Sequence, residues 1–156
     1  MLKTTMAALV ALSLAMPAAW AADPALLLQP TDTASAAALD LAAIKGLGGV
    51  TFETSTPWTD GKVTFEAVPG DRILPLLGGG GRVVQATALD DYAVEIPIED
   101  FKSGKAYIAY AMNGEPLPTD QFGPFWVVYR YDADPSLADE THQARSIWQL
   151  KSLSLR

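Results

Sequence analysis

The chain has 156 residues, a length typical of one domain, and its 11 basic and 18 acidic residues give a formal net charge of −7 at pH 7. This negative charge argues against binding to nucleic acid or to an anionic membrane surface. The sequence contains no cysteine and one histidine, His142, which excludes disulfides, a cysteine nucleophile and, within one chain, a zinc site of the usual composition.

The first 21 residues have the pattern of a secretory signal peptide. Lys3 supplies a positive charge, residues 6–19 form an apolar run, and Ala19-Trp20-Ala21 is a small-x-small cleavage pattern. The apolar run is shorter than the roughly 20 residues that span a bilayer. We therefore predict that residues 1–21 are removed and that residues 22–156 form one domain, exported to the periplasm and not inserted in the membrane. A retained membrane anchor is the alternative.

Strand patterns and two short helical patterns make up the first half of the predicted domain. We predict strands over residues 25–30, 50–54 and 62–68; in the last two, apolar and polar residues alternate, which places Val50 and Phe52 toward the core. Residues 35–49 are rich in alanine and leucine and end in glycines, which favours a helix. Residues 69–77 favour a second short helix, ended by the four glycines that follow.

The second half continues with strands. Residues 82–89 and 92–97 predict a hairpin that turns at Asp90-Asp91, and 98–101 predicts one helical turn. A strand over 106–112 ends at the turn dipeptide Asn113-Gly114. The most apolar strand, 125–131, is expected to be central, and 135–143 to be helical. The last strand, 146–155, shifts its apolar phase, which a bulge would explain. The class is α+β, with mixed β-structure and short flanking helices.

Several stretches that resemble sites have simpler explanations. The four glycines 78–81 follow a helix and precede a strand, whereas a phosphate-binding loop follows a strand and opens a helix. Asp132 and Asp134 are possible calcium ligands, but turn chemistry before Pro135 explains them better. The remaining acidic residues have no spacing that selects a pair for acid–base catalysis, and we interpret them as solvated faces.

Three other stretches combine an aromatic side chain with hydrogen-bonding groups near the ends of predicted strands. They are residues 54–61, 129–134 and 144–149. Core packing is one explanation for Trp58 and Trp148. The other is a binding site, because aromatic rings beside several fixed donors and acceptors suit a flat, polar, nitrogen-rich heterocycle.

Six segments occur in the order seen in one known family: TPWTDGKVTFEAV, DRILPLL, ALDDYAVEIPIEDF, GEPLP, GPFWVVYRYD and RSIWQLK. Over residues 25–155 the chain resembles the sulfite-oxidase-fold, molybdopterin-binding oxidoreductase domain, and among its members the small stand-alone PruR-type periplasmic pterin-binding proteins. The resemblance implies a single compact fold with a mixed, barrel-like β core. It also implies a pterin cleft to which the loop at 54–61 and the RSIW segment contribute.

One departure from the family bears directly on its chemistry. Catalytic members bind molybdenum through a cysteine after the strand that corresponds to residues 50–54, where this chain has Thr54 and Ser55. A neutral hydroxyl is a poor replacement for a thiolate on such a metal. The resemblance to the PruR-type proteins therefore implies a metal-free domain that binds a reduced pterin, with molybdopterin as the second choice. It further implies signalling to the periplasmic region of an inner-membrane enzyme that makes or degrades cyclic di-GMP.

The hypothesis assigns each candidate site residue a place around the pterin, and it assigns no catalytic residue and no metal ligand. Trp58, Tyr92 or Trp148 would line the ring. Thr54, Ser55 and Asp60 would satisfy the amino-pyrimidine edge, and Arg145 and Ser146 would hold the opposite end. Two other classes stay open: an oxidoreductase subunit whose molybdenum has only non-protein ligands, and an interaction domain with a vestigial cleft.

Overall fold

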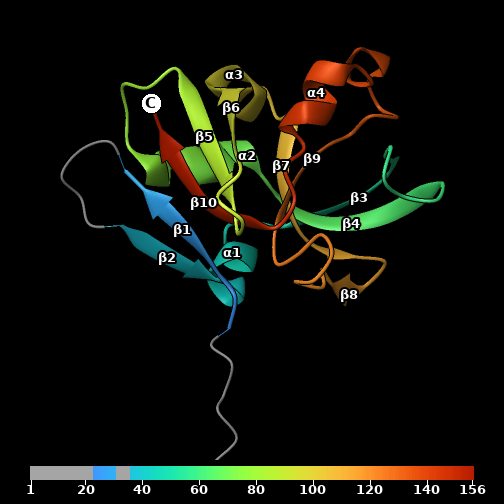
Figure 1. Cartoon of the computed structure of the whole chain (residues 1–156), viewed down its shortest axis with the longest axis horizontal. Coiled ribbons are helices and arrows are strands. Elements are labelled where there is room, and N and C mark those ends of the chain that lie inside the picture. Colours follow the sequence, from blue (N-terminus) through green and yellow to red (C-terminus); the bar gives the residue numbers. More distant parts are fainter. Residues whose placement is uncertain (1–22, 31–35) are drawn as a thin grey trace, which may run out of the picture.

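The computed structural model describes residues 23–30 and 36–156, so the predicted signal peptide lies outside the described residues. Within these ranges the chain forms two five-stranded sheets with short helices around them (Figure 1). The α+β class with short flanking helices is confirmed, and the two sheets do not close into a barrel in the described part of the chain. None of the described helices is both long enough and apolar enough to cross a membrane.

The first sheet joins the two ends of the described chain. Its strands are β1 (Ala25–Gln29), β2 (Ala37–Asp40), β5 (Val83–Ala88), β6 (Ala93–Pro97) and β10 (Leu150–Leu155), in the order β2-β1-β10-β5-β6. β1 runs parallel to β10, and the other pairs are antiparallel. The register between β10 and β5 shifts between Leu150 and Ser152, so the bulge predicted in the last strand is confirmed.

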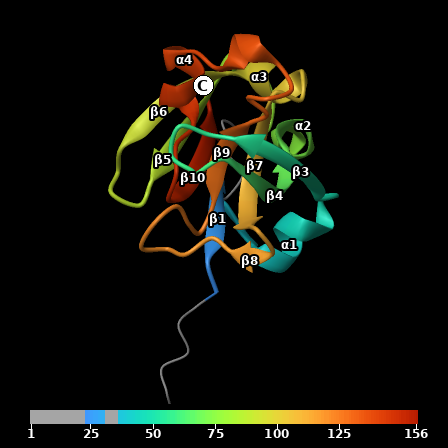
Figure 2. The same cartoon turned by 90° about the vertical axis from the view of Figure 1, so that its right-hand side faces the viewer.

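The second sheet contains β3 (Val50–Ser55), β4 (Lys62–Pro69), β7 (Ala106–Met112), β8 (Glu115–Pro116) and β9 (Trp126–Tyr129). Its order is β3-β4-β7-β8, and β9 pairs with β7 off this path. β9 is shorter than the predicted strand 125–131 and is not a central strand of that path. Figure 2 shows β9 between β10 and β7, where the two sheets meet.

The helices are short and sit at strand ends. They are α1 (Leu41–Gly46), α2 (Gly70–Ile73) with the 3₁₀ turn η1 (Leu74–Leu77), α3 (Ile98–Lys102), the 3₁₀ turn η2 (Pro135–Leu137) and α4 (Glu140–Arg145). The prediction of one helix over 35–49 is wrong in its first half, because β2 pairs there with β1 and tertiary pairing overrides the helix propensity of alanine. Asp40 then caps α1, its carboxylate accepting from Ala43 N at 2.7 Å.

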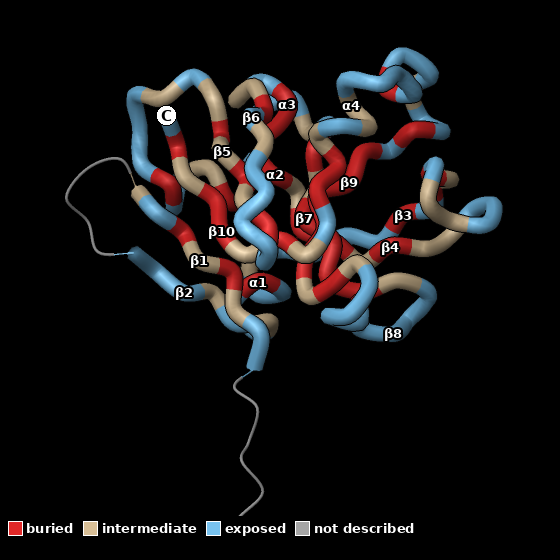
Figure 3. Tube along the Cα trace, in the orientation of Figure 1, coloured by how far each residue is buried: buried red, intermediate tan, exposed pale blue. Residues whose placement is uncertain are grey.

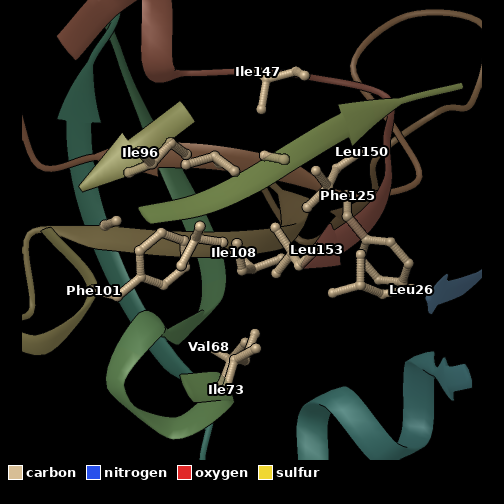
Figure 4. Close-up of a cluster of buried hydrophobic side chains, with 14 of the residues drawn as sticks. Leu26, Val68, Ile73, Ile96, Phe101, Ile108, Phe125, Ile147, Leu150 and Leu153 are labelled. Carbon is tan, nitrogen blue, oxygen red and sulfur yellow. The ribbon is translucent and has the colours of Figure 1, made fainter. Parts of the chain in front are cut away.

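Burial on both faces explains why β9 and β7 are apolar throughout. Val127 and Tyr129 belong to the larger core, while Trp126 and Val128 belong to a smaller cluster on the opposite face of the strand. Figure 3 shows β7 and β9 buried along almost their whole length. In the larger core Phe101 of α3 packs together with side chains from both sheets (Figure 4). The alternation of apolar residues correctly predicted that Phe52 is buried, but Val50, the first residue of β3, is exposed.

A pair of glycine substitutions tests this packing. A Cβ at Gly70, the first residue of α2, would lie 2.5 Å from Phe101 Cδ1 and 2.9 Å from Ala106 O. At Gly46, the last residue of α1, a Cβ would have no atom within 4 Å. We expect Gly70→Ala to lower the free energy of unfolding by roughly 1–3 kcal/mol through overpacking, and Gly46→Ala to leave it unchanged or raise it by up to about 1 kcal/mol. Denaturant unfolding measures both; equal effects would contradict the packing at Gly70.

Candidate functional site

A cleft of about 370 Å³ lies where three parts of the chain meet: the loop after β3, the tip of the β5–β6 hairpin, and the segment 143–149 that leads from α4 toward β10. Its lining residues are Trp58, Ala88, Asp90, Tyr92, Gln143, Ala144, Ser146, Ile147, Trp148 and Gln149. The volume falls within the range of roughly 300–1,000 Å³ that is usual for small-molecule sites. The cleft is therefore large enough for a bicyclic heterocycle.

Aromatic rings form much of the cleft wall. The rings of Trp58 and Trp148 meet edge to face, with centroids 5.3 Å apart, and Trp58 also meets the buried Trp126 at 5.9 Å. Trp148 keeps 37% and Tyr92 58% of their surface exposed. Large aromatic side chains exposed at the edge of a cleft leave ring surface available to a ligand.

The hydroxyl-rich loop 54–61 uses several of its hydroxyls to hold its own backbone. Thr56 Oγ1 accepts from Trp58 N, and Thr59 Oγ1 accepts from Thr56 N, both at 3.2 Å. The two hydroxyls also bond each other at 3.0 Å. These local bonds between side chains and backbone define the turn that carries Trp58 to the cleft.

Thr54 and Ser55 fasten the end of β3 to the chain after β9 and do not line the cleft. Thr54 is fully buried, and its hydroxyl accepts from Asp132 N at 3.1 Å. Ser55 donates to the Asp132 carboxylate from its hydroxyl at 2.5 Å and from its backbone N at 3.0 Å. These two bonds hold the pKa of Asp132 below its ordinary value. Asp60 is exposed and also lies outside the cleft lining.

Arg145 belongs to a partly buried polar cluster around Asp100 that does not line the cleft. Its Nη1 lies 3.1 Å from Asp100 Oδ2, and Tyr129 OH donates to the same oxygen at 2.9 Å. Burial, with the nearby Asp100 charge, raises the pKa of Tyr129 far above its ordinary range. Arg145 lines a second hollow, beside Glu95 and Glu140, and not the aromatic cleft.

Ser146 lines the cleft while its polar groups serve the fold. Its hydroxyl lies 2.6 Å from Tyr131 OH and donates to His142 O at 3.0 Å, and its carbonyl accepts from Trp126 Nε1 at 3.1 Å. Burial raises the pKa of Tyr131. These hydrogen bonds thus fix the backbone at Ser146, two residues before the exposed Trp148.

The structure brings four of the eight predicted site residues to one cleft and leaves four elsewhere. Trp58, Tyr92, Ser146 and Trp148 line the cleft; Thr54, Ser55, Asp60 and Arg145 do not. Their roles toward a ligand stay predictions. Sequence reasoning passed over Asp90 and Gln143, which also line the cleft. The only sequence signal for Asp90 was the hairpin turn, which does not tell what the tip of the hairpin faces.

The residues of this chain do not fit a molybdenum held by the protein. The whole sequence lacks the cysteine that would supply a thiolate, and the described residues contain no group of three or more histidine or acidic side chains placed to hold a metal. The cleft does fit the organic part of such a cofactor. Its rings would contact a flat heterocycle, and Asp90, Gln143 and Gln149 offer polar groups to the edge of that heterocycle.

Comparisons with known proteins bear on the fold and the family of this chain. The family model of the oxidoreductase molybdopterin binding domain matches residues 45–130, which is more than half of the chain. Among solved structures the chain is similar to the sulfane dehydrogenase SoxCD from Paracoccus pantotrophus, with a TM-score of 0.56 and 14% identity, covering 85% of this chain and 38% of that chain. This likeness concerns the fold alone, and the chain spans well under half of that protein. No curated protein matches the sequence. The predicted sulfite-oxidase-type fold is confirmed.

The polar cluster around Asp100 can be tested through the stability of the protein. Removing the carboxylate by Asp100→Ala leaves Arg145 and Tyr129 without their shared partner in a site where the Arg145 and Asp100 side chains are only 22% and 11% exposed. We expect a loss of roughly 2–4 kcal/mol in the free energy of unfolding. The matched control is Glu99→Ala, because Glu99 pairs with Lys102 at 3.3 Å in solvent, and there we expect less than about 1 kcal/mol. Thermal or denaturant unfolding distinguishes the two, and similar losses would contradict the cluster.

Proposed function

The chain belongs to the family of the oxidoreductase molybdopterin binding domain, and from this premise we propose that its aromatic cleft binds a pterin without a protein-held metal. One observation carries the proposal: a cleft of about 370 Å³ with two tryptophans and a tyrosine in its wall, in a chain without any cysteine. The family match supports a pterin-type cofactor. Because the chain has no cysteine, no residue can bind molybdenum as a thiolate.

The cleft suits a pterin because it offers both of the surfaces that such a ring needs. Trp148 and Tyr92 expose ring surface for stacking or edge contact. Polar side chains from both walls, the Asp90 carboxylate and the Gln143 amide, can meet the nitrogen-rich edge. We propose a reduced pterin as the ligand, as in the PruR-type proteins that the sequence resembles.

We further propose a sensory role in the periplasm. A ligand that bridges the β5–β6 hairpin and the segment 143–149 would favour one arrangement of these two surface elements. The periplasmic region of an inner-membrane enzyme that makes or degrades cyclic di-GMP would recognise that arrangement. The signal-peptide pattern in residues 1–21 and the resemblance to PruR-type proteins support this role.

A pterin-dependent oxidoreductase is the second candidate, and the family match itself favours it. In that case the molybdenum would be bound by non-protein ligands, and the chain would hold the group through the pterin. Its residues would orient the ring and exclude water, while the metal would supply the redox chemistry.

The binding proposal is tested by removing an exposed ring. Calorimetry with tetrahydrobiopterin under anaerobic conditions should show binding to the intact domain. Trp148→Ala should weaken it by roughly 10- to 100-fold, since one aromatic stacking contact contributes about 1–3 kcal/mol. The control is Leu89→Ala, because Leu89 is 47% exposed on the same hairpin as Tyr92 and does not line the cleft. Unchanged affinity in Trp148→Ala, or no binding at all, would refute the proposal.

Metal analysis separates the two candidate functions. Both the intact domain and the Trp148→Ala variant are purified from a host that makes molybdenum cofactors. The intact domain should contain no more molybdenum than the variant. It should, however, release a fluorescent pterin when it is denatured and oxidised. One molybdenum per chain would instead support the oxidoreductase. Native mass spectrometry that finds no bound molecule, together with no binding in calorimetry, would indicate a vestigial cleft.

A further inference from the structure

The aromatic cleft carries charge of one sign only. Among its ten lining residues Asp90 is acidic and none is lysine, arginine or histidine. The faces of the aromatic rings add negative electrostatic potential, because ring quadrupoles are negative at the face. A ligand in this cleft therefore meets a carboxylate and electron-rich rings, with no cationic side chain in the lining.

The cations next to the cleft in sequence are paired elsewhere. Arg145 precedes Ser146, but its guanidinium contacts Asp100 at 3.1 Å and lines the second hollow. Lys151 follows the segment 143–149, but its Nζ contacts Asp91 at 2.9 Å. Neither is in the cleft lining, so a phosphate group would find no cationic partner there.

Asp90 is held in place by its own turn. Its Oδ1 accepts from Tyr92 N at 3.0 Å, and the turn closes with Ala88 N donating to Tyr92 O at 2.8 Å. Asp91, the next residue, adopts a left-handed backbone conformation with φ = 66°, which lets the chain reverse its direction. The Asp90 carboxylate thus belongs to a defined turn at the cleft wall, a position suited to reading the edge of a ligand.

We propose that the cleft selects pterins that carry no phosphate, and that Asp90 is the residue that determines this specificity. The inference rests on the proposed pterin binding. A carboxylate accepts two parallel N–H bonds, which the 2-amino group and N3–H of a 2-amino-4-oxo pterin provide. A phosphate at the other end of such a ligand would meet no lining cation, and the negative charge of the cleft opposes its entry. Molybdopterin carries a phosphate, so the charge of the cleft disfavours it independently of the missing cysteine.

The test compares two ligands that share one ring and side chain, 7,8-dihydroneopterin and its triphosphate, by calorimetry in magnesium-free buffer at low salt. We expect dihydroneopterin to bind at least about tenfold more tightly, because like charges across a binding site oppose association. Raising the salt concentration should narrow this ratio, since ions screen the repulsion. Triphosphate binding as tight as that of dihydroneopterin would overturn the inference while leaving pterin binding intact. Binding of neither ligand would overturn both.

Two matched variants test the role of Asp90. Asp90→Asn keeps the turn but removes the charge, so it should weaken dihydroneopterin binding several-fold and reduce the discrimination against the triphosphate. Asp91→Asn removes the same charge from the neighbouring residue, which pairs with Lys151 and does not line the cleft. It should leave the affinity for dihydroneopterin unchanged. If the two variants behave alike, Asp90 is not the specificity-determining residue.

Discussion

The attachment of one segment to β9 determines the rest of the site. Val127 N donates to Ile147 O at 2.9 Å, and Leu150 N donates to Phe125 O at 2.8 Å. Trp126 Nε1 adds a third bond to Ser146 O from within the aromatic cluster. These bonds fasten the chain just before β10 to the buried strand β9, and so they position one wall of the cleft.

The polar residues fall into two groups: some join parts of the fold, and others line the cleft. Hydroxyls and charges that the sequence placed near a ligand, at Thr54, Ser55 and Arg145, instead join strand ends and helices through Asp132 and Asp100. The cleft itself is lined by aromatic rings and a few polar side chains, from the hairpin turn, from α4 and from the segment that follows it. Buried polar groups in the fold must form hydrogen bonds, and here the two partners of each bond are far apart in the sequence.

The cleft and the missing cysteine together support our proposal that this domain keeps the fold of its family while the protein itself holds no metal. In the family of the oxidoreductase molybdopterin binding domain, to which the chain belongs, the pterin and the metal are separable demands on the protein. The first needs flat apolar walls and an edge of donors and acceptors, which are present here. A metal held by the protein through a thiolate needs a cysteine, and the sequence contains none.

Local patterns in the sequence determined the α+β class, most strands, the hairpin turn at Asp90-Asp91, the bulge in the last strand and the absence of a thiolate ligand. Alternation, turn residues and composition act over a few residues, so they can be read without the fold. Only the tertiary structure decided that residues 37–40 form a strand, that Thr54 and Ser55 bond to Asp132, and that Asp90 and Trp148 line the same cleft. The physical reason is distance along the chain: Ser55 and its partner are 77 residues apart, and no local pattern encodes such a pair.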